Sequence, residues 1–174
     1  MDSSTRRRRR AVSTFAAGVC ASLLLTGCGF NMQTLQQYTP AHGVNVDLQA
    51  GEANRQLKVR NLLVVADESG KGVLSASIVS PVADRLVSVE GYALKMDNSV
   101  GAPLTVTGSG VDLEPNRLTV LTDPSPAFTV SSPDLKPGLT VDLVLNFESG
   151  LQAKAIAPVM SAEDPIYASA KPTS

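Results

Sequence analysis

Cys28 is the residue of this 174-residue chain whose type and surroundings indicate the clearest chemistry. It stands in the stretch "LLLTGCGF", after the five consecutive arginines Arg6 to Arg10 and a mostly apolar run from Ala11 to Leu25. A basic block, an apolar run and small residues at a cleavage point are typical of a secretory signal peptide. A membrane-spanning helix needs about 20 apolar residues, which is more than this run supplies.

The residues that end the apolar run resemble the bacterial lipobox: Leu25, Thr26, Gly27 and Cys28. In lipoproteins with this motif the cysteine sulfur receives a diacylglycerol, and cleavage before the cysteine makes it the first mature residue, with acyl chains such as palmitate. The resemblance implies a chain anchored at the extracytoplasmic face of the cell membrane. A plain signal peptide with an incidental cysteine is the alternative. Cys20 would leave with the signal peptide, so the mature chain would hold no disulfide and no free thiol.

Beyond residue 27 the chain carries 10 Lys and Arg against 15 Asp and Glu, a formal charge of −5. These charges are scattered, whereas a nucleic-acid-binding domain presents a basic face. We therefore expect no nucleic-acid partner. The expected partners are the membrane, held through the lipid on Cys28, and an envelope protein of unknown identity.

From residue 44 the chain alternates apolar, β-branched runs with turns rich in Gly, Pro, Asn and Asp. The run from Leu139 to Glu148 has the period of two of a half-buried strand, and Ser149-Gly150 predicts a hairpin turn into the run from Leu151 to Met160. Seven more strands are expected at 44–48, 57–66, 72–79, 85–94, 104–107, 117–122 and 127–131.

About nine short strands and no helical period predict an all-β fold, an antiparallel, immunoglobulin-like β-sandwich, with a small open barrel as the rival. The expected organisation is a signal peptide at 1–27, a polar tether at 28–43, the sandwich at 44–161 and a flexible tail at 162–174. The tether could span ~50 Å when fully extended.

Two stretches carry a resemblance to a known family. "ADRLVSVEG" (83–91) is followed later by "DLKPGLTVDLVLNFESGLQAKAIAPV" (134–159). This order resembles the periplasmic copper chaperone family PCuAC, formerly a domain of unknown function, and is closer to the LpqE-like lipoproteins of actinobacteria, a divergent branch. The resemblance spans roughly residues 44 to 160. It implies a cupredoxin-like β-sandwich in an actinobacterial cell envelope.

Typical members of that family bind Cu(I) through two histidines and two methionines, soft ligands that suit this ion. In this chain no histidine follows His42, and the corresponding positions fall near Tyr92, Pro103 and residues 125–127. The resemblance therefore implies a module that has lost the usual ligands, and we expect no metal cofactor. A rearranged copper site built on Met96 and His42, with Met160 as a further ligand, is the alternative. The competing interpretation makes His42 a turn residue, and Met32, Met96 and Met160 ordinary core or tether residues.

Catalytic motifs are missing from the sequence: there is no G-x-S-x-G elbow, no H-E-x-x-H and no P-loop. Ser109 and the acidic stretches at 67–70 and 97–99 are interpreted as turns, not as a nucleophile or calcium ligands. We therefore predict a non-catalytic binding or scaffolding module. The alternatives are a copper metallochaperone with a rearranged Met/His site and, less favoured, an enzyme with a cleft of perturbed carboxylates.

Overall fold

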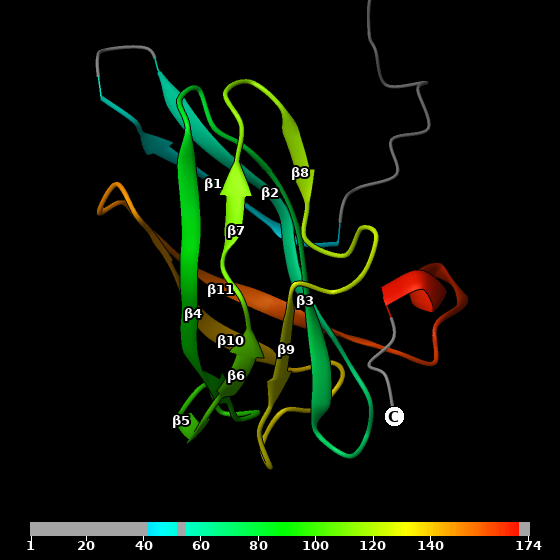
Figure 1. Cartoon of the computed structure of the whole chain (residues 1–174). Coiled ribbons are helices and arrows are strands. Elements are labelled where there is room, and N and C mark those ends of the chain that lie inside the picture. The colour runs from blue at the N-terminus through cyan, green and yellow to red at the C-terminus, as the bar shows by residue number, and fades with distance from the viewer. Residues whose placement is uncertain (1–41, 52–54, 171–174) are drawn as a thin grey trace, which may run out of the picture. The chain divides into compact units, whose positions relative to one another are not determined.

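The computed structural model describes residues 42–51 and 55–170 (Figure 1). Contacts divide the chain into two units, Met1–Pro40 and Ala41–Ser174, and only the second unit is described below. The predicted signal peptide, the lipobox with Cys28 and all of the tether up to residue 41 lie outside the described residues. No helix within the described ranges is long and apolar enough to cross a membrane.

Strands dominate the described residues, and their pairing is antiparallel except where β11 meets β2. The order along the main path is β5-β4-β10-β11-β2-β3-β9-β6, with β1 added to β2, β7 to β4 and β8 to β3. The strands are β1 (Val44–Gln49), β2 (Gln56–Ala66), β3 (Lys71–Val79), β4 (Asp84–Leu94), β5 (Val100–Pro103), β6 (Thr105–Gly108), β7 (Val111–Leu113), β8 (Leu118–Val120), β9 (Phe128–Ser131), β10 (Thr140–Phe147) and β11 (Gln152–Ser161).

The path forms the two layers of a sandwich (Figure 1). One layer contains β5, β7, β4, β10 and β11, and the other contains β1, β2, β3, β8, β9 and β6. The end of β11 joins the layers, because Val159–Ser161 pair in parallel with Val64–Ala66 of β2. The prediction of an all-β sandwich is confirmed.

The nine predicted strands are all present, with ends shifted by a few residues. The hairpin of β10 and β11 is confirmed: the N–H of Gly150 donates to the carbonyl of Phe147 at 2.9 Å, and Gly150 takes a positive φ of 85°. Two further strands, β5 and β7, were not predicted from the sequence. They have four and three residues and both pair with β4.

The main core lies between the two layers. β10 contributes Val141, Leu143 and Leu145, and β2 contributes Leu57 and Val59, all with no exposed surface. Burying each such side chain stabilises the fold by about 1.5–3 kcal/mol. All members of this core cluster lie between residues 44 and 159, so a soluble fragment of residues 29–174 retains the complete core.

Strand β2 changes character at Asn61. From Gln56 to Arg60 exposed and buried residues alternate, whereas Leu62–Ala66 are all fully buried. Asn61 has a positive φ of 52° at a shift in the β2–β3 register, which is a β-bulge. The N–H of Gly43 donates to the Asn61 side-chain oxygen at 2.8 Å, which ties the bulge to the start of β1.

The C-terminal segment covers the outer face of β2 beyond this bulge. Residues Pro165–Ala170 form a 3-10 helix, η2, and Tyr167 and Ala170 pack with Ala162 on Leu63 and Val65. The sequence predicted a flexible tail at 162–174, but Ala162, Tyr167 and Ala170 are buried against the sheet, and residues 171–174 lie outside the described residues. The reason is that the continuous apolar run of β2 has a second face that must be covered, and small residues in the tail allow close approach.

Candidate functional site

His42, the single histidine of the chain, precedes β1 and contacts the C-terminal segment. Its Nδ1 atom is hydrogen-bonded to the hydroxyl of Tyr167, and the two ring centroids are 6.0 Å apart. Burial, with a smaller effect of the Asp164 charge, raises the pKa of the Tyr167 hydroxyl. His42 therefore joins the start of the first strand to η2, which is a structural role that its sequence position does not reveal.

Met96 lies in the turn between β4 and β5, and its side chain is 88% exposed. The turn is built by its neighbours: the N–H of Lys95 donates to the carbonyl of Ser99 at 2.9 Å, and Asn98 takes a positive φ of 62°. The Ser99 hydroxyl donates to the Asp97 carboxylate at 2.6 Å and holds the pKa of that group below its usual value. These contacts are those of an ordinary turn, as the sequence predicted for residues 97–99.

The candidate copper ligands lie on separate elements. The β4–β5 turn that carries Met96 and the start of β1 that follows His42 are apart in Figure 1. Met160 is partly buried against the second cluster under η2, and Met32 lies outside the described residues. His42 and Met160 both lie beside the C-terminal segment that carries Tyr167, whereas Met96 lies on the β4–β5 turn, so the structure does not gather all three around one position.

The positions that correspond to the family's copper ligands are also separated. Tyr92 pairs directly with Pro103. Residues 125–127 instead precede Phe128, which pairs with Gly108, the last residue of β6. Pro103 ends β5 in one layer and Gly108 ends β6 in the other, so these positions belong to different strands.

These placements bear on whether the described residues could hold copper. Within the described ranges no three His, Cys, Asp or Glu side chains are grouped as a metal site. His42 is bonded to Tyr167 and Met96 is exposed on the β4–β5 turn, whereas a Cu(I) site of this type needs several soft ligands around one ion. In the described residues His42 and Met96 are therefore not arranged as ligands of one ion.

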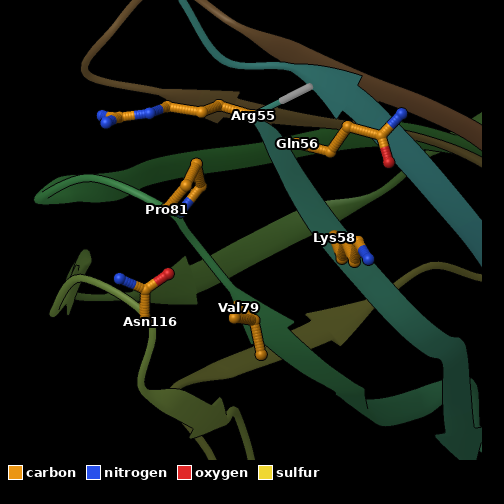
Figure 2. Close-up of a pocket in the computed structure, with 6 residues that line it drawn as sticks. All are labelled: Arg55, Gln56, Lys58, Val79, Pro81 and Asn116. Carbon is orange, nitrogen blue, oxygen red and sulfur yellow. The ribbon is translucent and has the colours of Figure 1, made fainter. Parts of the chain in front are cut away.

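The structure contains an open pocket of about 430 Å³ where β2 begins and β3 ends (Figure 2). In Figure 2, Val79 and Pro81 lie between the residues from the β2 side and Asn116. Lys58 and Val79 are direct partners in the β2–β3 register. The lining residues are Arg55, Gln56, Lys58, Val79, Pro81 and Asn116.

Sequence reasoning missed this pocket. The alternation of β2 shows that Lys58 faces outward, but it does not show which distant residues stand beside it. Val79 comes from another strand and Asn116 from the turn before β8, so only the pairing of the strands assembles the set.

Comparisons with known proteins found structural similarity alone: no family model and no curated protein matches this chain. Among solved structures, the apo PCuAC domain from PmoF1 is 20% identical, with a TM-score of 0.48, and the alignment covers 67% of this chain and 99% of that domain. The copper-bound PCuAC domain from PmoF2 is 15% identical, with a TM-score of 0.46, and the alignment covers 67% of this chain and 98% of that domain. The apo PCuAC domain from PmoF2 is 16% identical, with a TM-score of 0.43, and the alignment covers 68% of this chain and 98% of that domain.

Proposed function

We propose that this protein is a membrane-anchored cell-envelope lipoprotein whose copper-chaperone-like sandwich acts as a non-catalytic binding or scaffolding module. The lipobox residues before Cys28 and the sequence resemblance to LpqE-like lipoproteins support the anchor and the extracytoplasmic location. One observation carries the loss of copper chemistry: the single histidine is hydrogen-bonded to Tyr167, away from the turn that holds Met96.

The surroundings of the carboxylates support a non-catalytic role. Asp84 accepts hydrogen bonds from the backbone and hydroxyl of Ser149, the latter at 2.6 Å, and Asp134 accepts one from the N–H of Ala102 at 2.8 Å. Both groups hold loops together. Hydrogen bonds from Ser69 and Ser99 lower the pKa of the Asp67 and Asp97 carboxyls, each within a turn. A catalytic acid would instead need a raised pKa in a cleft.

The anchor is tested by expressing the full chain and a Cys28→Ser variant in a bacterium that processes lipoproteins. We expect the unmodified chain in the membrane fraction, with the mass of a diacylglycerol added to a chain that begins at Cys28. The variant should lack that mass because serine offers no thiol for lipid transfer. If both proteins lacked the lipid mass and were found in the same fractions, the anchor would be contradicted and the N-terminus would be a plain signal peptide.

A second candidate is a copper metallochaperone that presents Met96. The observation in its favour is the 88% exposure of this thioether at a turn, where a partner protein could complete the coordination. This candidate predicts copper binding that depends on Met96, and the first predicts none.

A further inference from the structure

The outer face of β4, β10 and β11 carries large apolar side chains that are open to solvent. Tyr92 is 50% exposed and Ile156 is 58% exposed, and both flank Asp142 of the central strand β10. The outer face of the other layer is different, because residues of the C-terminal segment cover Leu63 and Val65 there. Exposed apolar side chains gathered on one sheet face mark an interaction surface.

The strand register arranges this face in rows that run across the three strands. Residues that pair directly across two strands point to the same face of the sheet. Read from β4 through β10 to β11, the rows are Tyr92, Asp142 and Ile156; Glu90, Val144 and Lys154; and Ser88, Asn146 and Gln152. The β4 ends of the rows therefore carry an aromatic ring, a carboxylate and a hydroxyl. The β11 ends carry an aliphatic chain, an ammonium group and an amide, so the two ends of each row are chemically complementary.

Hydrogen bonds hold the polar part of this face in place. The Asn146 side-chain amide donates to the Glu90 carboxylate at 3.2 Å and to the Ser88 hydroxyl at 3.1 Å. The Gln152 amide donates to the Asn146 side-chain oxygen at 2.9 Å. Lys154 forms no ion pair with any residue that the structure describes. The face thus presents a positioned carboxylate and an unpaired ammonium group, and positioned groups lose less entropy on binding.

We propose that this face binds the same face of a second copy of the chain, about a twofold axis that runs parallel to β10 over Val144. Such an axis places the β4 end of each row on the β11 end of the same row in the other copy. Tyr92 then meets Ile156 of the partner subunit, and Glu90 meets Lys154 of the partner subunit. Each contact occurs twice, so apolar groups meet apolar groups and each carboxylate meets an ammonium group. This inference goes beyond the binding module proposed above.

The charges of the face select this axis over the other twofold axis that would pack the same two sheets. An axis across the strands, through the middle row, would place Glu90 on Glu90 and Lys154 on Lys154, and like charges in contact repel. The axis parallel to β10 avoids both repulsions and keeps the strands of the two copies aligned, as in β-sandwiches. It leaves one like-charge contact, between the two copies of Asp142, which lie on the axis. That contact weakens the dimer, and its removal should strengthen it.

The test is sedimentation equilibrium of the 29–174 fragment, which keeps the whole core, at concentrations up to about 1 mM. The rows lie roughly 7 Å apart on strands about 4.8 Å apart, so the patch is small and we expect a dissociation constant on the order of 0.1 mM. Backbone amide NMR signals of Tyr92, Val144 and Ile156 should shift with protein concentration, whereas that of Leu63 on the covered face should not.

Two outcomes of this experiment would overturn the dimer. The first is a fragment that stays a monomer over the whole concentration range. The second is a monomer whose Tyr92 and Ile156 signals shift when residues 29–41 are removed, which would assign the face to that segment of the same chain.

Charge reversals separate the proposed pairing from general attraction. Glu90→Lys and Lys154→Glu should each weaken the dimer at least about tenfold, because each places like charges opposite one another twice. The double variant restores both pairs with their signs exchanged and should return the dissociation constant to within about threefold of the unmodified value. Lys58→Glu makes the same charge change as Lys154→Glu but on the other layer, and should alter the dissociation constant less than about twofold.

Asp142→Asn should tighten the dimer a few fold, because it removes the like charges that face each other on the axis. A dimer that survives either single reversal, or a double variant no stronger than the single ones, would overturn the proposed pairing. The anchor and copper experiments do not depend on this result.

Discussion

The outer face of β2 is covered by other residues at its C-terminal end and exposed to solvent at its N-terminal end. Beyond the Asn61 bulge, Leu63 and Val65 are sealed under Tyr167 and Ala170. Before the bulge, Lys58 faces solvent in the open pocket, beside Val79 of β3. One strand thus provides a covered, apolar end and an uncovered, cationic end on the same side of the sheet.

This difference separates the part of β2 that stabilises the domain from the part that is accessible to a ligand. At the covered end the apolar contacts add a second, small core to the sandwich, and their loss should be felt in the free energy of unfolding. At the uncovered end the side chains contribute little to folding. The sequence can therefore change there for recognition at small cost to stability.

The sharpest test of the contrast is a pair of alanine variants on β2. Leu63→Ala should lower the free energy of unfolding by about 2–5 kcal/mol, because it removes a fully buried side chain and leaves a cavity. Lys58→Ala should change it by less than about 0.5 kcal/mol, because the side chain is exposed and unpaired among the described residues. Denaturant unfolding of both variants measures the two values, and similar losses would break the comparison.

The cover itself is tested at Tyr167. Tyr167→Ala should destabilise the domain by about 3 kcal/mol, since a large ring that packs on Leu63 and Val65 is lost. Tyr167→Phe keeps the ring and loses only the hydrogen bond to His42, so about 1 kcal/mol is expected. If Tyr167→Ala unfolds at the same denaturant concentration as the unmodified protein, the C-terminal segment does not cover the sheet.

The same tyrosine predicts a loss of stability in alkali. Burial raises the pKa of Tyr167 above its ordinary value of 10.0, so the unfolded state ionises first. The contribution is fully present below about pH 10 and is lost as the pH rises through the raised pKa. Unfolding measured from pH 8 to pH 11 should show a steeper decline for the unmodified protein than for Tyr167→Phe. Parallel declines would show that Tyr167 titrates normally.

The smallest effect on stability is expected from a substitution in the turn between β2 and β3, which follows the covered end of β2. The Ser69 hydroxyl donates to the Asp67 carboxylate at 2.7 Å and is the largest cause of that group's lowered pKa. Ser69→Ala should raise the pKa of Asp67 toward its ordinary value without a measurable change in the unfolding midpoint at pH 7. An NMR titration of the Asp67 side chain measures this, and an unchanged pKa would show that the serine does not hold the carboxylate.

Much of the fold could be predicted because its signals are local. The alternation from Leu139 to Glu148 and the Ser149-Gly150 turn specify one hairpin, and the structure forms it. The short strands β5 and β7 could not be predicted, since they exist only because β4 offers an edge to pair with. The packing of Ala162, Tyr167 and Ala170 was missed for a similar reason, because Leu63, which Tyr167 covers, lies about a hundred residues earlier.

The candidate sites also differ in whether they depend on neighbouring residues in the sequence or on contacts between distant segments. The sequence shows that His42 stands alone as a histidine, but its bond to Tyr167 depends on how the tail folds back. The pocket residues Lys58, Val79 and Asn116 are unremarkable in the sequence and meet only through strand pairing. The Cys28 motif is local and fully readable, and it stays a prediction because it lies outside the described residues.

A Cu(I) competition titration of the 29–174 fragment against a colourimetric chelator tests the central claim most directly, with His42→Ala and Met96→Ala variants measured in parallel. A binding module whose histidine is engaged by Tyr167 should hold Cu(I) no more tightly than an unrelated protein of similar methionine content, and neither variant should differ from the unmodified fragment. Stoichiometric binding that both substitutions weaken would contradict the account. It would show that His42 leaves Tyr167 to join Met96 around a copper ion.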